Sequence, residues 1–126
     1  MRHITVPHEI DFMAISSYGT GQRESTGAVR LILDLKTDIA GRDVLIFEDV
    51  VDTGLTLRKL LGLLGTRQPR SLKIAALLKK QLPENADLPV DFLGFTIGPE
   101  FVVGYGLDLD EKYRNLPYVA IWDPSK

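Results

Sequence analysis

One stretch of this chain, residues 44–57 with the sequence VLIFEDVVDTGLTL, constrains the fold more than any other. Four apolar residues run directly into the adjacent acids Glu48 and Asp49, and an Asp-Thr-Gly-x-Thr sequence precedes a leucine-rich helical pattern. A continuous apolar run bounded by polar residues is typical of a strand that is buried on both faces of a parallel sheet. The pattern predicts a buried strand, a tight loop and the start of a helix, and therefore an α/β fold in which helices flank a mostly parallel sheet.

The loop in this stretch has the composition of a ligand site. In open α/β sheets, ligands bind beyond the carboxyl ends of the strands, where we expect Glu48 and Asp49 to lie. Thr53, Gly54 and Thr56 fall where the helix begins, so that backbone N–H groups and hydroxyls can face an anion, and a glycine allows a phosphate to approach the backbone. Acids beside a phosphate require a compensating partner, which ribose hydroxyls or Mg²⁺ provide. The loop therefore predicts a sugar-phosphate site.

Other interpretations of the same residues remain open at this point. The acids are also explained by a solvated strand end that is followed by Thr53 as a helix N-cap. Paired acids after a strand also occur in receiver-type phosphoacceptors, although Thr-Gly-Leu-Thr fits a phosphate cradle better. A Walker P-loop is excluded because the chain has no Gly-x-x-x-x-Gly-Lys-Ser/Thr sequence.

Length and composition limit the class of protein. A chain of 126 residues predicts a single domain over residues 1–126 with a modest core. The net charge of -2 gives no reason to expect binding to nucleic acid or to a membrane. The absence of cysteine excludes disulfides and thiol chemistry and is compatible with the cytoplasm.

The hydrophobic periodicity gives more strands than helices. It predicts strands over residues 9–16, 29–35, 43–47, 72–78, 91–97, 101–106 and 118–122. One helix is predicted over residues 53–66, with one apolar face formed by Leu57, Leu60, Leu61 and Leu64. Because a parallel sheet needs helices on both faces, a single helix leaves one face bare. We expect a partner subunit, or a helical segment outside this chain, to cover that face.

Residues 44–57 resemble the 5-phosphoribosyl-1-pyrophosphate (PRPP) signature of the type I phosphoribosyltransferases, in the form closest to the hypoxanthine-guanine phosphoribosyltransferases. Three more segments resemble the same family. Residues 10–18 (IDFMAISSY) are similar to the strand before its flexible loop, residues 75–80 to the strand with its purine-contacting lysine, and residues 101–114 (FVVGYGLDLDEKYR) to its purine-stacking and metal-binding segment. The family's N-terminal strand and helix, with a Leu-Lys-Gly loop that contacts pyrophosphate, have no counterpart here, so we expect the chain to match the C-terminal two-thirds of the pattern.

The resemblance implies a function in purine salvage. The reaction is the Mg²⁺-dependent transfer of the 5-phosphoribosyl group from PRPP to hypoxanthine or guanine, which gives IMP or GMP and pyrophosphate. The resemblance also implies a homodimer or homotetramer in the cytoplasm. The alternative is a non-catalytic nucleotide-binding or PRPP-binding module with a regulatory role, or an inactive fragment, that has lost the pyrophosphate loop.

The resemblance assigns roles to the signature loop. Glu48 and Asp49 hold the ribose hydroxyls directly or through Mg²⁺. Asp52 lies near the purine N7 as general base or proton relay, although an acid at this position is also favoured by the helix dipole alone. The 5-phosphate is cradled by Thr53, Gly54 and Thr56 together with the backbone of Leu55.

The purine is assigned to two other segments. Lys80 donates to the 6-oxo group, which favours 6-oxopurines because an ammonium group cannot accept a hydrogen bond from an amino group. The neighbouring Lys79 leaves this register open by one residue, and both lysines are also explained as a solvated strand end. Phe101 stacks on the purine face and the Val102 backbone contacts the base edge, although both residues also suit a core.

The remaining roles concern pyrophosphate, metal and closure of the site. Asp108 resembles the acid of a second metal site, and Arg114 matches the position that approaches pyrophosphate. Ser17 and Tyr18 match the Ser-Tyr pair of the flexible loop, about residues 17–27, which closes over the site and excludes water. The same glycine-rich segment is also explained as a plain surface loop.

Overall fold

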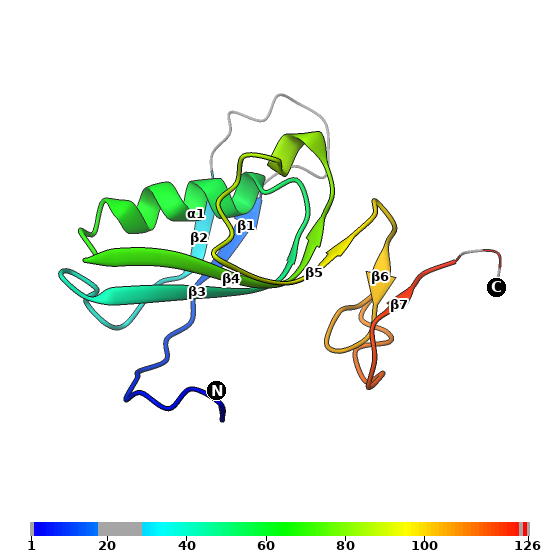
Figure 1. Ribbon diagram of the computed structural model, residues 1–126, viewed down its shortest axis with the longest axis horizontal. Coiled ribbons are helices and arrows are strands. Elements are labelled where there is room, and N and C mark those ends of the chain that lie inside the picture. The colour runs from blue at the N-terminus through cyan, green and yellow to red at the C-terminus, as the bar shows by residue number, and fades with distance from the viewer. Residues whose placement is uncertain (1, 18–28, 124, 126) are drawn as a thin grey trace. The chain divides into compact units, whose positions relative to one another are not determined.

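The computed structural model of the chain describes residues 2–17, 29–123 and 125 (Figure 1). Its elements, in chain order, are β1 (Ala14–Ser17), β2 (Val29–Leu33), β3 (Asp43–Val51), α1 (Leu55–Gly65), β4 (Ser71–Lys80), a single 3₁₀ turn (Pro83–Asn85), β5 (Phe92–Ile97), β6 (Val102–Val103) and β7 (Ala120–Ile121). The backbone forms two compact units. The first comprises Met1–Val44 and Thr56–Leu72, and the second comprises Leu45–Leu55 and Lys73–Lys126.

The first unit contains the antiparallel pair β1 and β2, in which Ala14 lies opposite Leu33 and Ser17 lies opposite Val29. Both strands are shorter than the hydrophobic pattern predicts, and the chain before β1 is irregular.

Asp11 explains part of this difference. Its carboxylate accepts backbone N–H groups from Phe12 at 2.8 Å, Lys36 at 2.7 Å and Thr37 at 2.9 Å. Bonds from a side chain to the backbone compete with the ladder of a sheet, so the strand begins only after Asp11.

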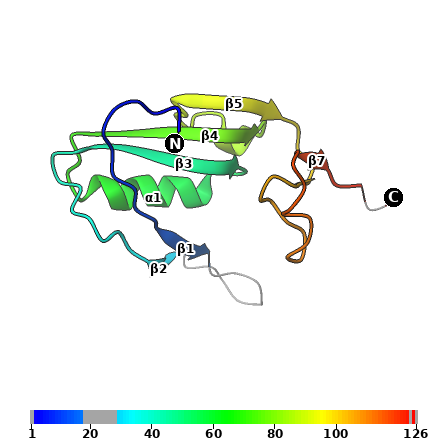
Figure 2. The ribbon, with the colours of Figure 1, turned by 90° about the horizontal axis from the view of Figure 1, so that it is seen from below.

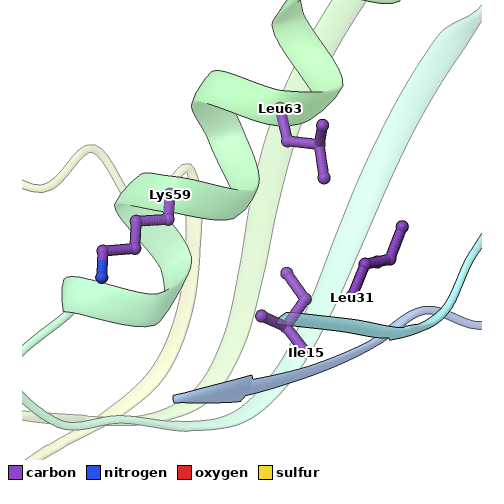
Figure 3. A pocket seen from close by; sticks show the side chains of 4 residues that line it. All are labelled: Ile15, Leu31, Lys59 and Leu63. Carbon is purple, nitrogen blue, oxygen red and sulfur yellow. The ribbon is translucent and has the colours of Figure 1, made fainter. Parts of the chain in front are cut away.

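Helix α1 begins two residues later than predicted and buries Leu57, Leu60 and Leu64 of the expected apolar face. Within the same unit, a pocket of about 190 Å³ lies between the hairpin and the helix, lined by Ile15, Leu31, Lys59 and Leu63 (Figure 3). None of the residues predicted for the ligand site lines this pocket. In the part of the chain that the structure describes, no helix has the length and apolar content needed to cross a membrane.

The second unit is built on a three-stranded parallel sheet in the order β3-β4-β5 (Figure 2), which confirms the predicted α/β class. The parallel register of β4 and β5 runs from Ala75 opposite Phe92 to Lys80 opposite Ile97. The carboxyl ends of these strands therefore meet at one edge of the sheet, as the predicted ligand site requires.

Strand β3 differs from its prediction in length and in burial. It continues through Glu48 and Asp49 to Val51, so the two acids lie within the strand rather than beyond its end. Its side chains alternate in exposure, and Leu45 and Phe47 are 40% and 65% exposed. The strand is therefore not buried on both faces, and its exposed apolar side chains agree with the expectation of an uncovered sheet face.

The chain after β5 forms the short antiparallel pair β6 and β7, in which Val102 lies opposite Ile121. The segment between these strands folds back on itself, and the Gly106 N–H donates to the Arg114 carbonyl at 3.0 Å. This fold brings the beginning and the end of residues 106–114 together.

Candidate functional site

The signature loop follows β3 directly and leads into α1. Gly54 is buried and has a φ of +79°, a conformation that glycine adopts without strain. The Thr53 hydroxyl accepts a long hydrogen bond, 3.5 Å, from the Leu55 N–H, and Thr56 is the exposed second residue of the helix. Because the first N–H groups of a helix have no partner within it, this loop presents backbone donors together with two hydroxyls.

Asp52 and Lys80 form an ion pair at the ends of adjacent strands. The Lys80 Nζ lies 2.9 Å from an Asp52 carboxylate oxygen. The Lys80 side chain is only 12% exposed, whereas that of Asp52 is 57% exposed. A nearly buried ammonium needs a counter-charge, so Asp52 neutralises Lys80 while it remains open to solvent. The neighbouring Lys79 instead donates to the Leu88 carbonyl at 3.3 Å.

Glu48 and Asp49 are adjacent acids near the end of β3, shortly before Asp52 in the chain. Burial raises the pKa of Glu48 above its ordinary value, and the neighbouring Asp49 carboxylate raises it further. The exposed Asp49 accepts the N–H of Val50 at 2.6 Å. Among the described residues, no three His, Cys, Asp or Glu side chains gather as metal ligands. Mg²⁺ commonly uses one or two carboxylates and takes its other ligands from water and substrate, so a carboxylate as poorly neutralised as Glu48 suits it.

A second cluster lies in the segment between β6 and β7, where Arg114 is held by two acids. Its Nη2 lies 3.0 Å from an Asp108 oxygen and 3.0 Å from a Glu111 oxygen, and its Nη1 donates to the Gly106 carbonyl at 2.9 Å. The other Asp108 oxygen accepts the Glu111 N–H at 2.9 Å. Both oxygens of Asp108 are therefore engaged, and the guanidinium charge is neutralised within the segment.

Three other predicted residues lie in or beside the short strands. Phe101 lies between β5 and β6 and is about half exposed, and its carbonyl accepts the Trp122 N–H at 2.7 Å. Val102 is buried as the first residue of β6. Ser17 is the last residue of β1, whereas Tyr18 and the rest of the predicted flexible loop lie outside the described residues.

Comparison with known proteins agrees with this geometry. Residues 1–110 match the model of the phosphoribosyl transferase domain family. This chain belongs to that family. The resemblance seen in the sequence, and the phosphoribosyltransferase fold that it implied, are thereby confirmed.

Individual phosphoribosyltransferases are similar over most of the chain. The hypoxanthine phosphoribosyltransferase of Salmonella typhimurium is 52% identical over 119 residues, which are 94% of this chain and 66% of that enzyme. The hypoxanthine-guanine phosphoribosyltransferase of Mycobacterium avium is 53% identical over 123 residues, 98% of this chain and 60% of that enzyme. A crystal structure of a Staphylococcus aureus hypoxanthine phosphoribosyltransferase superposes with a TM-score of 0.89 at 47% identity, over 98% of this chain and 67% of that one. The chain thus spans about 60–66% of the length of these two curated relatives.

Two residues of the candidate site were not found from the sequence. Glu111 shares Arg114 with Asp108, and the buried Asn85 donates from its side chain to the carbonyls of Asp52 and Lys80. A signal for Asn85 was present, because a proline followed two residues later by asparagine is typical of a tight turn. That pattern locates a turn but does not indicate that its asparagine faces the strand ends.

Proposed function

We propose that this chain carries out the Mg²⁺-dependent transfer of a 5-phosphoribosyl group from PRPP to hypoxanthine or guanine, as part of purine salvage in the cytoplasm. The products are IMP or GMP and pyrophosphate. The observation that carries the proposal is the Asp52–Lys80 pair, 2.9 Å apart, at the strand end that leads into the Gly54 loop. The names of the relatives, which act on hypoxanthine or on hypoxanthine and guanine, support it.

In this proposal, the contact between Asp52 and Lys80 is replaced by contacts from each of them to the purine. Lys80 donates to the 6-oxo group in place of the Asp52 carboxylate. Asp52, released from Lys80 and open to solvent on its other side, accepts a proton or a hydrogen bond at N7. Phe101 stacks on the base, and the Val102 backbone contacts its edge. Since Lys80 can only donate, adenine with its 6-amino group is disfavoured.

The ribose and the 5-phosphate occupy the loop that begins at β3. Glu48 and Asp49 accept the ribose hydroxyls and bind Mg²⁺, which when bound neutralises part of the charge on the departing pyrophosphate. The 5-phosphate receives the backbone N–H groups and hydroxyls of the loop residues Thr53, Gly54, Leu55 and Thr56. Holding both ends of the sugar restricts the reacting carbon to one geometry, which favours an oxocarbenium-like transition state.

Pyrophosphate release involves the cluster around Arg114. In the proposal, Arg114 donates to pyrophosphate and Asp108 supports a second Mg²⁺ through water. Both actions require Arg114 to exchange its contacts with Asp108 and Glu111 for contacts with the ligand. The loop with Ser17 and Tyr18 closes over the site and excludes water.

The proposed assembly is a homodimer or homotetramer of single-domain chains. The exposure of Leu45 and Phe47 on β3 supports it, because exposed apolar side chains on one sheet favour association.

The test is turnover by the purified chain with Mg²⁺, PRPP and, separately, hypoxanthine, guanine, xanthine and adenine. We expect nucleotide formation with hypoxanthine or guanine and none with adenine, and loss of activity in the Asp52→Asn variant. The absence of nucleotide with every base would contradict the proposal. In that case, calorimetric binding of IMP or GMP without turnover would indicate the non-catalytic module.

A further inference from the structure

Asn85 lies at the point where strands β3 and β4 end. Its side chain is almost completely buried, with 1% of the residue exposed. The Nδ2 group donates to the backbone carbonyl of Asp52 and, at 2.9 Å, to the backbone carbonyl of Lys80. An amide NH₂ has two hydrogens, so one group satisfies both acceptors.

The two carbonyls lie where the regular ladder stops. Strand β3 ends at Val51 and β4 ends at Lys80, so neither neighbouring strand offers a regular donor beyond these points. The Lys80 carbonyl also accepts the Leu82 N–H at 3.1 Å. The two hydrogen bonds from the Asn85 amide therefore tie both strand ends to one buried side chain.

The turn that carries Asn85 is itself well held. Leu82 is extended, as expected before a proline, and the Asn85 N–H donates to the Leu82 carbonyl at 3.3 Å. The Leu88 N–H donates a hydrogen bond to the Asn85 carbonyl at 3.1 Å. The buried Leu88 side chain and the Asn85 Cβ lie 3.0 Å and 3.5 Å from the place where a Cβ on Gly54 would be. The turn therefore packs against the signature loop as well.

We propose that Asn85 is a positioning residue, whose single buried amide fixes the spacing between Asp52 and Lys80. The amide binds the backbone carbonyls of Asp52 and Lys80, the two residues whose side chains form the ion pair. Their 2.9 Å contact therefore depends on the bridge. Under the proposed function, which supplies the role of the pair in reading the purine, Asn85 holds the base-recognition groups in register without touching the base.

The test compares Asn85→Asp, whose carboxylate cannot donate to a carbonyl, with Asn85→Ser, which keeps one shorter donor. Asn115→Asp at an exposed position is the matched control. The first measurement is the Lys80 ammonium ¹⁵N–¹H signal in the unliganded chain, which is visible when a carboxylate holds the group away from water. We expect the signal in the unmodified chain and the control, and its loss in Asn85→Asp or, if that variant does not fold, in Asn85→Ser.

The second measurement compares binding of IMP with binding of ribose 5-phosphate, which lacks the base. We expect the Kd for IMP to rise roughly tenfold or more, because small displacements of paired groups have large effects, while the Kd for ribose 5-phosphate changes by less than about twofold. An unchanged Lys80 signal in a folded variant, or an equal loss for both ligands, would overturn the assignment. If the unmodified chain does not bind IMP, the proposed function fails, and the Lys80 signal alone decides the role of Asn85.

Discussion

Glu48 combines a half-buried carboxylate with an acidic neighbour, Asp49, and its pKa is raised by that burial first and by Asp49 second. A raised pKa means that the folded chain retains a proton that the unfolded chain releases. The free energy of unfolding therefore falls as the pH rises through the interval above about 4.5, the ordinary value for this group. Proteins retain such unfavourable groups where a ligand compensates for them.

Replacing Glu48 by glutamine should stabilise the folded chain and weaken ligand binding. At pH 7 we expect the Tm of Glu48→Gln to rise by roughly 2–4 °C, because the desolvated charge is removed. Well below pH 4.5 the carboxyl group is protonated in both states, so the difference should vanish. Calorimetric scans across pH measure this, and titration with Mg²⁺ and ribose 5-phosphate should show weaker binding. Glu100→Gln, at an exposed position, is the control. A difference in Tm that does not depend on pH would contradict the explanation.

Gly54 allows a sharper test of the signature loop. An alanine there would have to adopt a φ of +79° and would bring its Cβ to 3.0 Å from a Leu88 methyl group. We expect Gly54→Ala to lower the free energy of unfolding by about 1–3 kcal/mol. Gly62→Ala is the matched control, because that position lies in α1 with no atom within 4 Å of the added Cβ. It should stabilise the chain by about 0.5–1 kcal/mol. Urea unfolding of both variants measures the difference, and changes of the same sign would argue against this account.

Gly94 of β5 lies close against the backbone of Leu77 in β4. A Cβ on Gly94 would lie 2.5 Å from the Leu77 carbonyl oxygen, so the two strands cannot keep their spacing around a larger residue. We expect Gly94→Ala to cost about 1–3 kcal/mol. We also expect amide exchange to accelerate along β5, while the exposed Thr96→Ala on the same strand has little effect. Protection of β5 that is equal in the two variants would show that the strand adjusts freely.

The sequence predicted the elements better than it predicted their ends. Among the described residues, apolar periodicity located the strands and the helix, because burial tends to repeat with the period of the backbone. It placed the end of β3 too early, because Glu48 and Asp49 look like the start of a loop although both are accommodated in the strand. It also missed how Asp11 shortens β1 and how the turn at Pro83 directs Asn85 inward. These features depend on contacts between a side chain and a distant backbone group, which no local pattern encodes.

For the candidate site, the sequence indicated which residues to consider but not all of their contacts. The resemblance assigned both Asp52 and Lys80 to the purine, and the two residues lie in contact at the ends of adjacent strands. The engagement of Arg114 with Glu111 was not predictable, because the chain turns around these residues through positions with positive φ, namely Asp110, Glu111 and Tyr113. The roles of these residues in binding and catalysis stay predictions for the experiments described above.

At the scale of the whole chain, the sequence predicts a single domain, and the backbone forms two compact units. Three elements have residues in both, since β3 passes from one to the other after Val44, β4 does so after Leu72, and α1 begins with Leu55 in one and Thr56 in the other. Continuous hydrogen-bonded elements resist partial unfolding, so we expect one cooperative transition. Scanning calorimetry should give equal calorimetric and van't Hoff enthalpies. Two separated transitions would show that the units are independent domains.

The contact between Lys80 and Asp52 has a consequence for any molecule that approaches it. Because the Lys80 ammonium group already has a partner, a ligand must offer a hydrogen-bond acceptor strong enough to displace the Asp52 carboxylate. The Asp52 carboxylate therefore competes with any such ligand from a fixed position beside Lys80. A ligand with a weak hydrogen-bond acceptor cannot displace the carboxylate, whatever its shape. Under the proposed function, selectivity at Lys80 depends on the contact that the ligand displaces as well as on the contact that it makes.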